Sequence, residues 1–206
     1  MDSTDAAGLI AELHEEKAEH EADDRFRSRA ALLIAILAAI LAIGGLGGGN
    51  ATDDMIGSNI RASDAWAFYQ AKNIRQTAYE LEADALRSSL EAGALAPPQR
   101  LSAEARLNDY RATIARYDSE PDARDPSKGE GKKELMAQAQ AHERAFETAS
   151  ARDDNFDFAE VALQLALVLG SVAILALNRW ILALAGALGL IGSLLTLNGF
   201  LLLVPL

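Results

Sequence analysis

Three long stretches almost free of charge are the feature that most constrains the fold of this 206-residue chain. The first covers residues 30–49, the second covers 158–177 with Glu160 as its one charged residue, and the third covers 181–206. A helix that crosses about 30 Å of hydrocarbon needs about 20 apolar residues. The sequence therefore predicts three transmembrane helices, the last two joined by a tight loop at 178–180.

The charged residues lie in the two remaining parts of the chain, whose net charge is −11. Residues 1–29 are rich in acidic side chains and predict a mostly solvated tail, with one or two helical turns around Leu9 and Leu13 as the alternative. Residues 50–157 show helical periodicity and no strand-like alternation. We expect an all-α membrane protein with a long, coiled-coil-like extramembrane hairpin between its first and second spans.

Breaker residues divide this hairpin. We expect an outgoing arm at 51–93, a turn with two adjacent prolines at 94–101, and a return arm at 102–157 that begins with Ser102 as helix cap. Prolines and glycines at 119–131 predict a break in the return arm. The two arms are almost equally long, which favours a hairpin over the alternative of a compact three-helix domain.

Two stripes predict which faces of the arms meet. On the outgoing arm the stripe consists of Ile60, Ala67, Ala71, Ile74, Ala78, Leu81 and Ala85. On the returning arm, residues seven apart form a seam: Leu135, His142, Ala149, Phe156 and Leu163. Because this seam keeps its register into the second apolar stretch, it predicts one continuous helix from about Glu134 into the second span.

Each predicted span also carries a stripe of small residues. In the first span the stripe is Ala31, Ala35, Ala38, Ala42, Gly45 and Gly49. In the second it is Ala159, Ala162, Ala166, Gly170 and Ala173. In the third it is Ala185, Gly189, Gly192, Thr196 and Gly199. Small side chains let helices approach closely in lipid, so these stripes predict tight packing within one chain or between copies.

An aromatic cluster interrupts the outgoing arm. Trp66, Phe68 and Tyr69 point to different sides of the helix, which favours neighbours on several sides, as in an oligomer. The alternative is an interfacial helix anchored by these rings. A polar Gln70 beside the stripe is suited to fix helix register, and Lys72 to pair with Asp64 or a neighbouring chain, or to bind an anion.

The same residues carry a resemblance. The pattern D-x-W-x-F-Y-Q-A-K from Asp64 to Lys72 resembles an uncharacterised bacterial family of small membrane proteins, a domain of unknown function. The likeness continues in His142-Glu-Arg and in Asn178-Arg-Trp before the third span, and it departs at 119–133. It implies a bacterial inner-membrane protein of this architecture and brings no activity with it.

Little in the sequence indicates chemistry. There is no cysteine, and the two histidines of the acidic tail are six residues apart, on opposite sides of a helix. We expect no catalytic, cofactor or metal site, no nucleic-acid partner and no small-molecule substrate. His142 has the character of a partnered packing residue. The candidate interaction residues are Asp64, Trp66, Phe68, Tyr69, Gln70, Lys72, His142, Phe156, Asn178, Arg179 and Trp180.

Basic residues close to the spans predict the orientation. Three arginines precede the first span and one lies in the 178–180 loop, so the N-terminus is expected in the cytoplasm, with 50–157 and the C-terminus in the periplasm. The functional hypothesis is a non-enzymatic scaffold in the lipid bilayer, either a homo-oligomer or a subunit of a larger membrane complex. The alternative is a sensor or transport module whose hairpin recognises a ligand.

Overall fold

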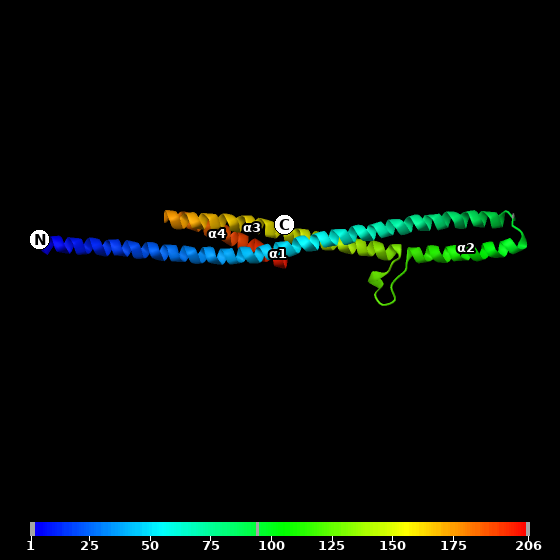
Figure 1. Cartoon of the computed structure of the whole chain (residues 1–206), viewed down its shortest axis with the longest axis horizontal. Helices are drawn as coiled ribbons and strands as arrows, with labels where there is room; N and C mark the ends of the chain where they lie inside the picture. Colours follow the sequence, from blue (N-terminus) through cyan, green and yellow to red (C-terminus); the bar gives the residue numbers. More distant parts are fainter. Residues whose placement is uncertain (1–2, 94, 205–206) are drawn as a thin grey trace. The chain divides into compact units, whose positions relative to one another are not determined.

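The computed structural model describes residues 3–93 and 95–204, and in this part of the chain the regular structure is entirely helical (Figure 1). The elements in chain order are α1 (Ser3–Glu91), α2 (Pro97–Asp118), the short 3-10 helix η1 (Pro126–Lys128), α3 (Lys132–Ala176) and α4 (Arg179–Leu201). Three of these helices, α1, α3 and α4, are long and apolar enough to cross a membrane.

Two helix starts differ from the sequence-based expectation. The acidic segment is part of α1, which begins at Ser3, although its described side chains from residue 13 onward are mostly exposed, as a solvated segment requires. Helix α2 begins at Pro97 and not at Ser102, because proline needs no hydrogen-bond partner in the first turn of a helix. The Gln99 side chain accepts a hydrogen bond (3.2 Å) from the Ala96 N–H in front of that turn.

Two compact units make up the chain. The span unit contains the residues up to Asp53 and those from Ala149 onward, and the arm unit contains Asp54–Thr148. Both α1 and α3 contribute to each unit. The candidate membrane spans belong to the span unit, while α2 and the predicted break belong to the arm unit.

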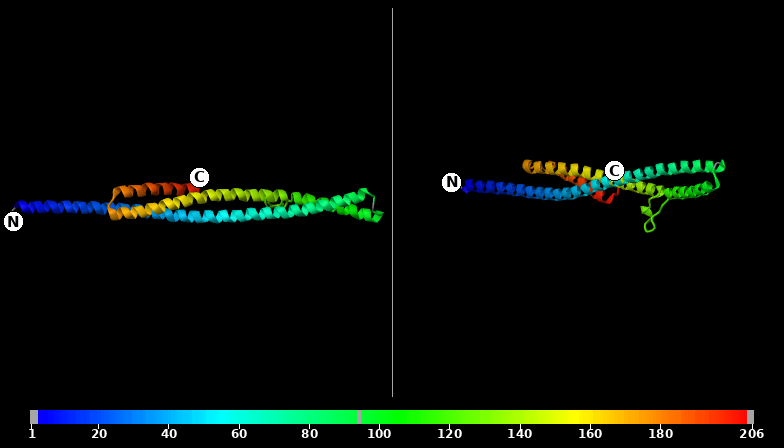
Figure 2. Two further views of the ribbon diagram at one scale, coloured as in Figure 1. Left: turned by 90° about the horizontal axis from the view of Figure 1, so that it is seen from above. Right: turned by 45° about the vertical axis from the view of Figure 1, so that its right-hand side comes forward.

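In the span unit, α3 and α4 lie along the apolar part of α1 (Figure 2). Small residues allow this close approach. All five stripe residues of the third predicted span are buried in α4. A Cβ added to Gly189 would lie 2.6 Å from Leu37 of α1, and one added to Gly192 would lie 2.7 Å from Leu163 of α3. A Cβ on Gly170 would lie 2.9 Å from Ile34. The predicted use of small residues for close packing is therefore confirmed for α3 and α4.

The small-residue stripe predicted in the first span remains exposed in the described chain, which leaves packing between copies as its predicted use. The stripe from Ala31 to Gly49 is exposed at all six positions. The face of α1 that packs against α3 and α4 instead contains Ala30, Leu37, Gly44 and Gly47, of which Leu37 belongs to the apolar core. Both faces of α1 carry small residues, so the sequence pattern alone did not distinguish them.

In the arm unit, α2 and α3 lie against successive parts of α1. Tyr79 of α1 contacts Tyr110 and Tyr117 of α2, with ring centroids 5.4 and 6.0 Å apart. Nearer the start of the unit, Trp66 of α1 reaches Glu143 of α3. The return arm therefore consists of the two helices α2 and α3, joined by the segment between Asp118 and Lys132 that contains the short 3-10 helix η1.

The face of α1 turned towards these helices is not the predicted stripe. Ile60, Ile74 and Leu81 are 56, 71 and 67 % exposed. Small and polar residues occupy the buried seam of the arm unit, at successive intervals of four, three, eleven and seven residues: Ser58, Ala62, Ala65, Gln76 and Ala83. A ranking by hydrophobicity selects the wrong face here, because small residues at the seam allow close helix contact.

The seam of α3 is confirmed. In the arm unit Leu135 is buried and His142 half-buried; in the span unit Ala149, Phe156 and Leu163 are buried. Helix α3 is unbroken from Lys132 to Ala176, as the constant heptad spacing predicts.

Candidate interaction sites

Two of the three clustered aromatic rings pack within the chain. The Trp66 indole N–H donates a hydrogen bond of 2.8 Å to a carboxylate oxygen of Glu143, and its ring meets Tyr69 edge to face at 5.6 Å. Phe68 alone is largely exposed, at 64 %. For Trp66, α3 of the same chain supplies a neighbour, so the position of this ring does not by itself indicate a second chain.

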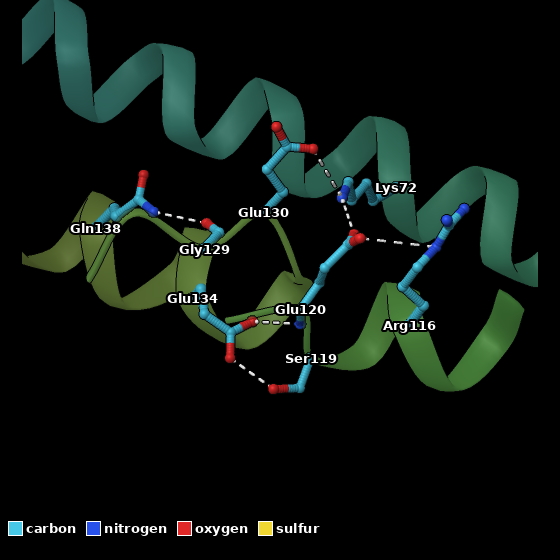
Figure 3. A network of polar contacts seen from close by, with 8 residues as sticks. All are labelled: Lys72, Arg116, Ser119, Glu120, Gly129, Glu130, Glu134 and Gln138. Carbon is cyan, nitrogen blue, oxygen red and sulfur yellow. Dashed lines mark hydrogen bonds and ion pairs between the residues drawn. The ribbon is translucent and has the colours of Figure 1, made fainter. Parts of the chain in front are cut away.

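Lys72 forms the centre of a polar network between α1 and the segment after α2 (Figure 3). Its side chain is 13 % exposed, and its Nζ lies 3.5 Å from Glu120 and 3.8 Å from Glu130. The same ammonium lies 5.6 Å from the ring centroid of Tyr117. Burial of a lysine needs such compensation. The expected partner Asp64 is an exposed residue and has no part in this network.

Glu134 holds the other side of this network, at the start of α3 (Figure 3). Its carboxylate accepts hydrogen bonds from the Ser119 hydroxyl (2.6 Å) and the Glu120 backbone N–H (3.1 Å). Burial disfavours the charged carboxylate, but these hydrogen bonds outweigh it and hold the pKa of Glu134 below its ordinary value. The ionised carboxylate therefore ties the end of α2 to the start of α3.

The polar residue of the seam that bonds to α2 is Gln76, not the predicted Gln70. Gln70 is exposed, whereas Gln76 is 3 % exposed and donates a hydrogen bond of 2.9 Å to Asp118 at the end of α2. Lys132 also lies 3.4 Å from Asp118, which places α1, α2 and α3 around one carboxylate. The spacing of four from Lys72 to Gln76 is the sequence signal that could have identified it.

A second polar cluster lies in the span unit and was missed in the sequence. Asn155 is completely buried, and its side-chain oxygen accepts a hydrogen bond of 2.7 Å from the Asn198 amide. The Asn198 side chain also bonds the Val204 backbone after α4, and the Thr52 hydroxyl donates to Asp153 at 2.7 Å. These contacts join α1, α3 and the end of α4, and Asn155 beside the seam residue Phe156 was the available signal.

Phe156 of α3 packs against glycines of both α1 and α4 in the span unit. Its ring lies 5.0 Å from that of Phe200, and it fills the space in front of Gly47 and Gly199. A Cβ on either glycine would come within 2.8 Å of the Phe156 ring. Phe156 is therefore a packing residue of this unit and not an exposed interaction residue.

The three candidates at the α3–α4 connection have separate surroundings. Asn178 caps α4, because its side-chain oxygen accepts hydrogen bonds from the Trp180 N–H (2.9 Å) and the Ile181 N–H (3.4 Å). Arg179 is exposed, and Trp180 is 85 % exposed. An exposed tryptophan beside an arginine at the end of an apolar helix is the arrangement of membrane–water interfaces.

His142 and Phe68 border two cavities of the arm unit. A cavity of about 470 Å³ lies beside α3 at Gln138 and His142. A second cavity, of about 400 Å³, has Phe68, Arg75, Lys128 and Leu135 among its lining residues. Among the residues that the structure describes, no group of three or more His, Asp or Glu is placed to hold a metal ion.

The family model of a domain of unknown function, DUF4337, matches residues 26–202. The chain belongs to this family. The match spans α1 from its apolar part through α4, and so includes both units. Neither the curated proteins nor the solved structures contain a match to the chain. DUF4337 membership therefore brings no activity to the site, which has to be interpreted from its own contacts.

Proposed function

We propose that this DUF4337 protein is a non-enzymatic membrane scaffold that assembles through contacts between copies of α1. The proposal places it in a bacterial inner membrane, with the N-terminus in the cytoplasm and residues 50–157 and the C-terminus in the periplasm. Three arginines before the first apolar stretch support this orientation. The exposed Trp180 and Arg179 fit a membrane interface at the α3–α4 connection.

One observation carries the proposal: the small-residue stripe of α1 is left open. The comparable stripes of α3 and α4 are used for packing inside the span unit, whereas all six residues from Ala31 to Gly49 are exposed. Close helix packing in lipid depends on such small residues, because apolar burial gives no net gain there. A second α1 helix is a suitable neighbour, since it carries the same small-residue face.

Native mass measurement in mild detergent tests this function. We expect the unmodified protein to give a multiple of its 22.0 kDa protomer mass. Replacing Ala38 and Ala42 by leucine should shift the mass towards one copy, because bulky side chains then separate the α1 helices. The matched control replaces Ala39 and Ile43 by leucine, at exposed positions turned about 100° away on the same helix. An unmodified protein that runs as one copy at all concentrations contradicts the proposal.

A cavity in the arm unit favours a second candidate function, recognition of a ligand by the hairpin. The cavity of about 400 Å³ is lined by apolar Phe68 and Leu135 and by three cations and one carboxylate: Lys72, Arg75, Lys128 and Glu130. Its net positive charge suits an organic anion with an apolar part. A panel of aromatic and aliphatic carboxylates should then raise the melting temperature of the protein and affect an Arg75→Ala variant less. Equal effects on both proteins, or none, contradict this function.

A further inference from the structure

The reverse face of α1 in the arm unit carries an apolar stripe that the described part of the chain does not cover. We call Ile60, Ala67, Ile74 and Leu81 the outer stripe. Its three large residues are between 56 and 71 % exposed. At about 100° per residue, these positions lie opposite the buried seam at Ala62 and Ala83. Helix α1 thus has two faces with helix-contact spacing, and the arm unit uses one of them.

The outer stripe has the regularity of a helix–helix interface. Single exposed apolar residues are common on protein surfaces and need no explanation. Here four apolar residues follow one another at intervals of seven, and alanines occupy the positions four residues after three of them: Ala71, Ala78 and Ala85. Large residues alternating with alanine allow two helices to approach closely and interlock.

The outer stripe is also large enough for a weak but specific contact. From the exposed fractions of its large residues and the exposed alanines beside them, each copy offers at most about 500 Å² of mainly apolar surface. Two copies together would bury at most about 1,000 Å², which is the lower limit for a biological interface. Contact between the span units would add to this area.

We infer that the outer stripe packs against the outer stripe of a second copy of this chain, parallel and in register. This inference rests on the proposed function, which already assigns contacts between copies to α1. Copies inserted in one membrane with one orientation are parallel, and a two-fold pair places each residue opposite its own counterpart. Between Ala67 and Leu81 the neighbouring positions on this face are Gln70, Ala71, Thr77 and Ala78, so the pair brings no like charges together there.

Single-cysteine cross-linking in isolated membranes tests the surface, because the chain contains no cysteine of its own. The test variant is Ile74→Cys, and its matched control is Arg75→Cys, an exposed neighbour turned about 100° away. Paired helix axes lie about 8–10 Å apart, so only the Ile74→Cys thiols come within reach of a short bismaleimide or of oxidation. Leu81→Cys repeats the test one heptad later. We expect at least ten times more cross-linked dimer from Ile74→Cys and Leu81→Cys than from Arg75→Cys.

The possible results separate this inference from the proposed function. If the native mass shows several copies while Ile74→Cys cross-links as weakly as Arg75→Cys, the inference that outer stripes pair is overturned. This result leaves the proposed scaffold function in place. A native mass of one copy contradicts the scaffold itself. An Ile74→Cys adduct whose mass is not twice the protomer mass shows a partner other than a second copy, and also overturns the inference.

Discussion

Gly47 provides the sharpest test of packing in the span unit. A methyl group at this position would lie 2.6 Å from Phe156 and 2.8 Å from Phe200. The Phe156 ring is 4 % exposed and is also held in front of Gly199, so it has little room to move away. Gly47→Ala should therefore force the helices apart and destabilise the unit.

The matched control is Gly186→Ala in α4, where an added methyl group would meet Leu33 at an ordinary contact distance of 3.9 Å. Both substitutions gain the same helix propensity, of at most about 1 kcal/mol. Overpacking costs about 1–3 kcal/mol and applies to Gly47→Ala alone. We expect Gly47→Ala to be less stable than Gly186→Ala by this amount, which corresponds to about a 5- to 150-fold increase in the fraction of open molecules.

A cysteine introduced at Ala166 measures this difference. Ala166 is completely buried in α3, and no other cysteine in the chain competes for a labelling reagent. The rate of thiol labelling is measured in mixed micelles with increasing sodium dodecyl sulfate, for each glycine variant in the Ala166→Cys background. Equal labelling of the two variants, or slower labelling of Gly47→Ala, would show that close contact at Gly47 does not hold the helices together.

Three further substitutions test the polar contacts. Asn198→Ala leaves the buried Asn155 side-chain oxygen without its donor and should cost the span unit about 1–3 kcal/mol in the same labelling assay; no loss would refute the contact. Trp66→Phe removes the hydrogen bond to Glu143 and should lower the stability of the arm unit by about 0.5–1.5 kcal/mol, measured by thermal unfolding followed by circular dichroism. The native mass should stay the same, and a change in mass would show that Trp66 contributes to contacts between chains. The pKa of Glu134 is lowered on folding. The contribution of its carboxylate to folding stability is therefore complete above the ordinary pKa of 4.5 and is lost as pH falls through the lower folded pKa. Glu134→Gln should thus lower the melting temperature more at pH 6 than near pH 3, and a constant difference across this range would contradict the assignment.

The sequence was most informative where a single physical requirement decided the outcome. A long stretch without charge can form an apolar helix whatever its neighbours are. This requirement alone predicted the apolar parts of α1, α3 and α4. The α3 seam was likewise visible, because Leu135, Phe156 and Leu163 are large and keep one spacing.

The faces of α1 were harder to predict because both have helix-contact spacing. The outer stripe contains Ile60, Ile74 and Leu81, whereas the buried seam contains alanines and polar residues such as Gln76. Gln76 finds its partner Asp118 at a distance of 42 residues in sequence, and no local pattern encodes such a contact. The start of α2 at Pro97 was missed because a local rule was applied too strictly. Proline is excluded from helix interiors but not from the first turn of a helix.

The number of copies in an undisturbed membrane tests the central claim most directly. Nanodiscs cut from the membrane by a polymer keep neighbouring chains together without detergent, and their mass after subtraction of lipid and polymer gives the copy number. The account predicts two or more copies of the 22.0 kDa protomer in one disc, with the Ala38→Leu, Ala42→Leu double variant reduced to one. One copy per disc for the unmodified protein, at every expression level, would contradict it.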